Sequence, residues 1–108
     1  MNDLRGKILR IKPEADGTYS LPADNLFPAD GSEGKPEIYV MGARNPFRIA
    51  VDNKTGFVYW GDVGPDVGVD GRYGPESFDE WNQARSPGNY GWPYFVGNNR
   101  AYPDRNFE

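Results

Sequence analysis

The stretch from Asp79 to Pro93 combines acidic, turn-forming and aromatic residues in one short segment. The adjacent carboxylates of Asp79 and Glu80 come first, and a Pro-Gly-Asn turn then leads to Tyr90 and Trp92, which are separated by one glycine. Carboxylates supply the oxygen ligands that hard cations prefer, and aromatic rings offer flat apolar surfaces. The segment therefore predicts a site for a cation together with a planar or sugar-like ligand.

Arg44 is a second residue with chemical potential, because it lies in a tight Gly-Ala-Arg-Asn-Pro corner that ends at Pro46. A fixed backbone at this corner aims the guanidinium fork at a carboxylate or a similar oxygen of a ligand. The alternative is structural: the arginine pairs with a nearby aspartate and holds a loop in place. The residues themselves leave both interpretations open.

The composition limits the chemistry that the chain itself performs. It has no histidine and no cysteine among its 108 residues, so the commonest general base and every thiolate site are absent, and acid–base chemistry rests on carboxylates. The net charge is −4 without a basic cluster, which argues against nucleic-acid binding. No segment approaches the roughly 18 apolar residues of a membrane span.

Short β-strands separated by turns are the elements that must position these residues. Gly and Pro number 14 and 10, which favours a turn-rich chain, while an aromatic content of 15% supports a folded one. The strands that we expect are residues 6–11 and 17–20, which form a short hairpin, and residues 37–41, 47–51, 57–60 and 78–83. Residues 21–36 and 61–77 read as long surface loops.

The link at residues 52–56 is a five-residue hairpin loop with Gly56 where a positive φ is needed, so the strands beside it are antiparallel. Several short strands at such spacing predict an all-β sandwich, barrel or propeller. The order fits one propeller blade followed by the start of the next. A blade takes about 40 to 50 residues, so residues 1–108 form a single segment of about two blades from a larger ring.

Four motifs in register resemble the glucose/sorbosone dehydrogenase family, the soluble quinoprotein sugar dehydrogenases with a six-bladed β-propeller. They are Gly6 to Ile11, Gly42 to Pro46, a Gly-Pro pair followed by Asp79-Glu80, and Gly88 to Pro93. The resemblance covers nearly the whole chain. It implies pyrroloquinoline quinone (PQQ) and Ca²⁺ as cofactors, a sugar as the substrate of the parent protein, and a periplasmic or secreted location.

The resemblance also implies roles for individual residues. Arg44 and Asn45 correspond to residues that contact the quinone, while Glu80 and Tyr90 correspond to residues of a calcium site. The Gly-Pro pair whose carbonyls face calcium is Gly74-Pro75 by its spacing to Asp79-Glu80, or Gly64-Pro65 by its place directly after a strand; we favour the former.

Each of these roles has a purely structural alternative. Asp79 and Glu80 cap a turn or pair with Arg85. The loop carboxylates are expected to solvate the loop, and Trp60 and Trp81 are expected to pack between sheets. These acidic loop residues are Asp62, Asp66 and Asp70.

The resemblance implies that the parent protein is an oxidoreductase acting on a sugar CH–OH group. The family's histidine base belongs to an upstream blade, so this chain carries no assigned catalytic residue and is expected to be inactive alone. The alternative is a non-catalytic carbohydrate-binding or scaffold propeller. Exposed blade faces and open strand edges further predict self-association of the chain.

Overall fold

The computed structural model describes residues 2–103, and within them the regular structure consists entirely of strands. Their bounds are β1 (Lys7–Leu9), β2 (Lys12–Pro13), β3 (Tyr19–Ser20), β4 (Ile38–Met41), β5 (Pro46–Val51), β6 (Val58–Asp62), β7 (Glu80–Ala84), β8 (Gly88–Asn89), β9 (Phe95–Val96) and β10 (Arg100–Ala101). This confirms the all-β class. No helix in the described part is long and apolar enough to cross a membrane. The ends of the predicted 1–108 segment lie outside the described residues.

The first sheet has the order β1-β4-β8. Strand β4 forms where Ile38, Tyr39 and Val40 follow one another; it is the central strand between β1 and β8, and all three residues are buried. β1 pairs with it antiparallel and β8 pairs with it parallel. The prediction of one strand at residues 6–11, paired in a hairpin with residues 17–20, is wrong in part. Strand β1 ends at Leu9, and the hairpin consists of β2 and β3.

The second sheet has the order β5-β6-β7, and both pairings are antiparallel. The predicted hairpin between β5 and β6 is confirmed: Gly56 has φ of 73° and donates from its N–H to the Asp52 carbonyl oxygen at 2.7 Å. Strand β7 begins at Glu80, two residues later than expected at 78, and extends to Ala84. Further along, β9 occupies Phe95–Val96, a stretch for which the sequence analysis predicts no strand.

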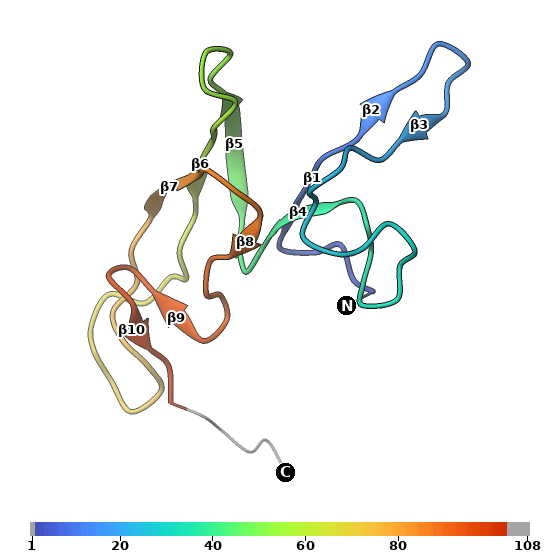
Figure 1. The fold of residues 1–108 in the computed structure, drawn as a ribbon. Coiled ribbons are helices and arrows are strands. Elements are labelled where there is room, and N and C mark those ends of the chain that lie inside the picture. The colour runs from blue at the N-terminus through green and yellow to red at the C-terminus, as the bar shows by residue number, and fades with distance from the viewer. Residues whose placement is uncertain (1, 104–108) are drawn as a thin grey trace.

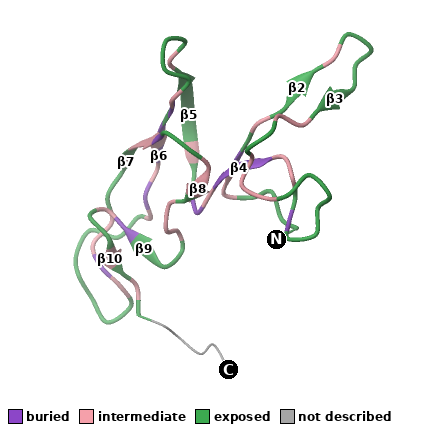
Figure 2. Ribbon diagram, viewed as in Figure 1, coloured by how far each residue is buried: buried purple, intermediate pink, exposed green. Residues whose placement is uncertain are grey.

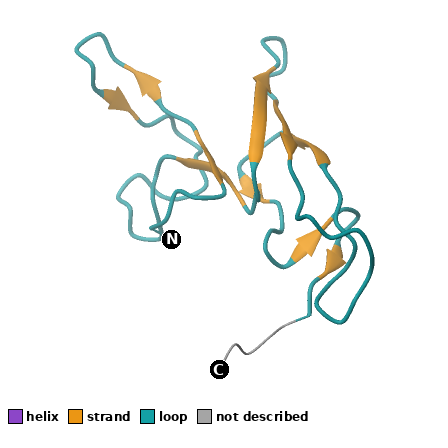
Figure 3. Cartoon of the chain, turned by 180° about the vertical axis from the view of Figure 1, so that it is seen from behind, coloured by secondary structure: helices purple, strands orange, loops and turns teal. Residues whose placement is uncertain are grey.

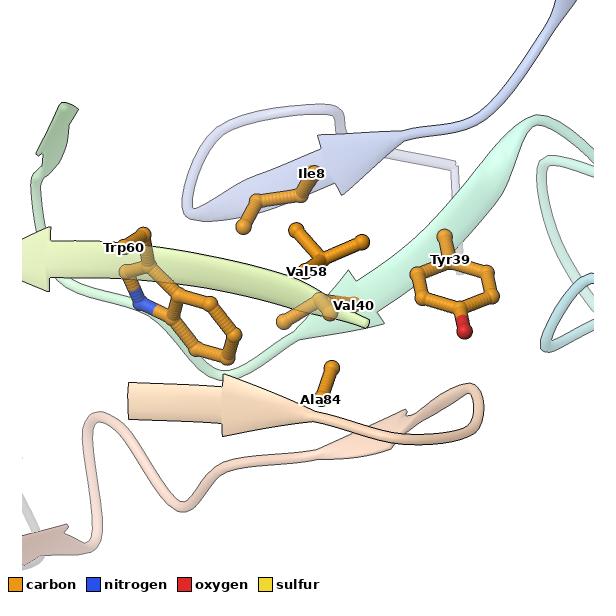
Figure 4. Packing of buried hydrophobic residues seen from close by; sticks show 6 residues of the cluster. All are labelled: Ile8, Tyr39, Val40, Val58, Trp60 and Ala84. Atoms are coloured by element: carbon orange, nitrogen blue, oxygen red, sulfur yellow. The ribbon is translucent and has the colours of Figure 1, made fainter. Parts of the chain in front are cut away.

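The core joins the two three-stranded sheets. Ile8, Tyr39 and Val40 contribute from one sheet, and Val58, Trp60 and Ala84 contribute from the other. Figure 4 shows these six side chains converging between the strands. Trp60 is the largest of the fully buried side chains, with an exposed fraction of 0%.

Trp81 does not pack in this core, so its predicted packing role is wrong. Its side chain is 87% exposed. Trp81 pairs with Gly61 across the sheet, whereas Trp60 pairs with Asn82, and neighbouring residues of a strand point to opposite faces. Trp60 therefore faces the core, and Trp81 lies on the open face of the same sheet.

The molecule is open in shape. Its radius of gyration is 15.7 Å, whereas a compact chain of this length has about 13 Å. The β2–β3 and β5–β6 hairpins project as two separate arms, in front and rear views alike (Figures 1 and 3). The β2–β3 hairpin and strand β5 are largely exposed, whereas β4, β6 and β9 carry buried residues (Figure 2). This arrangement is consistent with a propeller segment that has a small shared core.

Candidate functional site

Arg44 and Asn45 lie in the corner between β4 and β5, and the Asp62 carboxylate holds their backbone. The Arg44 N–H donates to Asp62 Oδ2 at 3.0 Å, and the Asn45 N–H donates to Asp62 Oδ1 at 2.6 Å. Asp62 is 8% exposed, so the expectation that it solvates the loop is wrong. Its place at the end of β6, opposite Pro46, brings it to the corner.

The Arg44 side chain is fixed by two further contacts. Its Nη1 donates to the Val63 carbonyl oxygen at 2.9 Å, and its guanidinium carbon lies 5.8 Å from the centre of the Trp92 ring. A guanidinium has five N–H donors, and this hydrogen bond uses one of them. The corner therefore presents a cation whose position is set and whose fork retains further donors.

Asp79 and Glu80 each accept a hydrogen bond from the backbone of a different loop. Asp79 Oδ1 accepts from the Gly64 N–H at 2.9 Å, and Glu80 Oε1 accepts from the Gly97 N–H at 2.5 Å. The capping alternative thus describes both carboxylates. Arg85 is engaged elsewhere, because its Nε donates to Gln83 Oε1 at 2.5 Å.

Glu80 and Asp62 face each other across β6 and β7. Two carboxylates opposite one another repel, and a cation placed between them relieves that repulsion. They line a cavity of about 20 Å³ together with Arg44, Tyr90 and Trp92. This volume accommodates roughly one water molecule, and therefore one small ion.

Tyr90 links this cavity to the core. Its hydroxyl donates to the Gln83 carbonyl oxygen at 3.2 Å, and its ring meets Trp60 edge-on with centres 4.8 Å apart. Burial raises the pKa of the Tyr90 hydroxyl, so the phenol is neutral at physiological pH. Its N–H donates to the Met41 carbonyl oxygen at 2.9 Å, which fixes the backbone beside Trp92.

The structure separates the two Gly-Pro pairs. Gly64 and Pro65 line the same small cavity as Arg44 and Glu80. Gly74 and Pro75 line a different, wide surface hollow of about 430 Å³. Four of the site residues that the sequence predicts therefore lie with Gly64-Pro65, the alternative pair, and not with Gly74-Pro75, the favoured pair. These four positions are Arg44, Asn45 through its backbone, Glu80 and Tyr90.

A broad cleft of about 460 Å³ lies next to the small cavity, and Arg44 and Trp92 line both. Arg5 and Lys7 line this cleft too, together with Asp3, whose carboxylate is paired with the Arg5 guanidinium. Lys7 and Arg44 are thus the cationic side chains of the cleft that carry no carboxylate partner there, and they lie beside an indole ring. An anionic planar ligand suits such a lining. The sequence analysis missed these residues because Arg5 and Lys7 lie far from Arg44 along the chain.

In the described part of the chain, no three Asp, Glu, His or Cys side chains gather in a way that could hold a metal ion. Calcium takes six to eight oxygen ligands, and backbone carbonyls and water commonly supply several. The carboxylates of Asp62 and Glu80 beside the Gly64-Pro65 backbone are the donor set that this cavity offers. Its chemistry suits a hard cation.

Comparison with known proteins identifies the family of this chain. The family model described as "Glucose / Sorbosone dehydrogenase" matches residues 1–107. The chain belongs to the glucose/sorbosone dehydrogenase family. The expected resemblance is therefore confirmed, and with it the β-propeller fold class.

Two relatives come from Arabidopsis thaliana. The HIPL1 protein is 32% identical over 114 residues, which cover 94% of this chain and 15% of that protein. The HIPL2 protein is 31% identical over 106 residues, which cover 87% of this chain and 14% of that protein. The glucose/sorbosone dehydrogenase segment described here thus spans about one seventh of the length of these relatives. No solved structure matches it significantly.

Proposed function

We propose that this chain supplies part of the quinone- and calcium-binding surface of a PQQ-dependent sugar dehydrogenase, an oxidoreductase that acts on a sugar CH–OH group. The observation that carries the proposal is that Arg44 and Trp92 line both an acidic, ion-sized cavity and a wide basic cleft. An ion and a planar anion would then bind side by side, with Arg44 between them.

The charge of the cleft supports PQQ as its ligand. PQQ is a planar tricarboxylate, and Lys7 and Arg44 offer cationic partners beside the Trp92 ring, while Arg5 is paired with Asp3. When bound, PQQ supplies a quinone that accepts two electrons. The role of Arg44 and Asn45 in this proposal is to bind and orient the quinone, and the Arg44 guanidinium stabilises negative charge that develops on its oxygens.

The small cavity fits Ca²⁺. We assign Glu80, the lining residue Tyr90 and the carbonyls of Gly64 and Pro65 to this ion, and add Asp62 on the strength of its position opposite Glu80. This assignment replaces Gly74-Pro75, which line the separate hollow. We further propose a periplasmic or secreted location for the parent protein, which cell fractionation tests.

A non-catalytic carbohydrate-binding or scaffold propeller is the second candidate. The absence of histidine from all 108 residues is compatible with it and equally with the dehydrogenase, whose histidine base belongs to an upstream blade in the family. The two functions differ in one respect, which is whether another part of the parent protein supplies a general base at the quinone. The sequence of the parent gene upstream of this segment distinguishes them.

Titration of the chain with PQQ tests the proposal. Quenching of tryptophan fluorescence should saturate with PQQ, and Arg44→Lys should weaken binding about tenfold, because lysine lacks the planar fork. Arg48→Lys is the matched control, since Arg48 lies outside the cleft. Equal affinity for both variants, or no saturable quenching, would remove the quinone from the proposal.

A further inference from the structure

Strand β5 is an open edge of its sheet. The sheet order is β5-β6-β7, and no strand in the described residues pairs with the outer side of β5. With six residues it is the longest strand in this part of the chain, and it is exposed from Phe47 to Val51 (Figure 2). A long edge with unpaired backbone groups is a template for pairing with another chain.

The ladder between β5 and β6 determines which backbone groups are open. The Asp52 N–H donates to the Phe57 carbonyl oxygen at 3.0 Å, one step beyond the last residue pair of the two strands. In an antiparallel ladder, every second residue bonds to the same neighbour. Ala50 lies two residues before Asp52 and therefore bonds to β6. The N–H and C=O groups of its neighbours Ile49 and Val51 then point away from β6.

The side chains along this edge are suited to a second copy of the same strand. Phe47, Ile49 and Val51 are apolar and exposed by 62%, 55% and 57%. The single charge on the strand belongs to Arg48, whose guanidinium carbon lies 4.3 Å from the centre of the Phe47 ring. No carboxylate of β5 therefore opposes self-pairing, although the chain as a whole is acidic.

We propose that β5 pairs antiparallel with β5 of a second copy of this chain, around a two-fold axis at Ile49. This register pairs the open groups of Ile49 in both copies, and it directs those of Val51 to the second copy's Phe47, where the β-bulge lies. It places Ile49 opposite Ile49 of the second copy and Phe47 opposite Val51. Arg48 then lies opposite Ala50, so that the two arginines do not face each other.

The pairing closes at two copies. An isologous contact uses the same strand in both partners, so the β5 edge is consumed in the dimer. The opposite edge of the sheet, β7, is partly closed, because the Tyr90 hydroxyl donates to its Gln83 carbonyl oxygen at 3.2 Å. The β-bulge at Phe47 shortens the regular stretch of β5, which makes the dimer weak and dependent on concentration. This proposal is independent of quinone or calcium binding.

Amide hydrogen exchange across a hundredfold range of concentration tests the register. The Ala50 amide should be protected at every concentration, because it bonds within one copy. The Ile49 and Val51 amides should exchange freely in dilute solution and slow at least tenfold in concentrated solution. Light scattering in parallel should show the mass rising from 12.1 kDa toward double that value. A constant monomer mass, growth beyond the dimer, or protection that does not alternate would each overturn the proposal.

Cysteine cross-linking gives a second test, because the chain contains no cysteine. Facing residues of a bonded antiparallel pair have Cα atoms about 5.5 Å apart, within the range of a disulfide. Ile49→Cys should oxidise to a covalent dimer much faster than Val69→Cys, a control on an exposed loop. Equal rates would mean that the contact is random. If Ile49→Cys fails to fold, the exchange experiment on the unsubstituted chain still decides.

Discussion

At the scale of single residues, Asp62 determines how Arg44 is presented. Its buried carboxylate accepts hydrogen bonds from two consecutive backbone N–H groups, those of Arg44 and Asn45. Hydrogen bonds to an ionised acceptor are roughly twice as strong as neutral ones. The corner is therefore rigid before any ligand binds, and the guanidinium fork does not need to be ordered by the ligand.

The carboxylates of Asp62 and Glu80 lead to a prediction about calcium. A cation that binds between them stabilises the folded chain by mass action, about 1.4 kcal/mol when calcium is at about ten times Kd. We expect the melting temperature to rise by several degrees at millimolar calcium. Neutralisation by Asp62→Asn or Glu80→Gln should abolish the rise, because each removes a negative charge from the cavity.

The control for this experiment is Asp66→Asn, which changes an exposed carboxylate on the loop after β6. It should retain the full calcium effect. Magnesium serves as a second control, because it is smaller and keeps its water shell. If Glu80→Gln and the unsubstituted chain respond alike to calcium, the cavity is not a calcium site.

At the scale of elements, the contact between β4 and β8 depends on Gly42. Gly42 has φ of 75°, and a Cβ placed there would lie 2.2 Å from Asn89 Oδ1 and 2.7 Å from the Gly91 nitrogen. Its carbonyl oxygen accepts a hydrogen bond from the Trp92 N–H at 2.9 Å. The glycine thus lets the segment that carries Tyr90 and Trp92 approach the Arg44 corner.

Substitution by alanine at two glycines separates backbone strain from steric clash. Gly56 has nearly the same φ, 73°, but open space around it. Gly56→Ala should therefore cost only the left-handed penalty of about 1–2 kcal/mol, whereas Gly42→Ala adds a clash worth roughly 1–3 kcal/mol more. Urea denaturation measures both free energies of unfolding. Equal losses would show that β8 moves aside without cost.

The elements that the sequence predicts well are those with local causes. The β5–β6 hairpin follows from two apolar runs and a loop that ends in Gly56, and the structure confirms it. The parallel pairing of β4 with β8 joins segments far apart in the chain, and the two-residue strand β8 has no periodicity to reveal it. Long-range pairing of this kind leaves little trace in local sequence.

Side-chain orientation shows the same limit. Alternation along β6 predicts that Trp60 and Asp62 share one face of the sheet. Trp81 pairs with Gly61 and so lies on the other face, but alternation does not say which face is covered. That depends on the contact between sheets, which places Trp60 in the core and leaves Trp81 exposed. For the same reason the motifs located Arg44 and Glu80, while the roles of Asp62, Arg5 and Lys7 in the site became visible only in three dimensions.

At the scale of the whole molecule, the small shared core and the extended arms leave the proposed quinone cleft open on one side. The cleft of about 460 Å³ is lined by residues near the N-terminus, the Arg44 corner and the Trp92-Pro93 corner. A ligand held there contacts protein on few sides. Water therefore remains in the site, which weakens the electrostatic interactions that Arg44 makes with a bound anion.

This openness and the absence of histidine lead to a prediction about activity. Loss of a general base alone commonly lowers a rate by about 10²- to 10⁴-fold, and incomplete exclusion of water lowers it further. We expect the 108-residue chain, supplied with PQQ, calcium and glucose, to reduce a dye acceptor no faster than a control without protein. An Arg44→Ala preparation, measured in parallel, identifies any turnover that comes from a contaminant, because contaminating activity is the same in both. Turnover that exceeds the control and is lost in Arg44→Ala would show that the carboxylates of this chain provide the base themselves, with Glu80 beside Arg44 as the first to test.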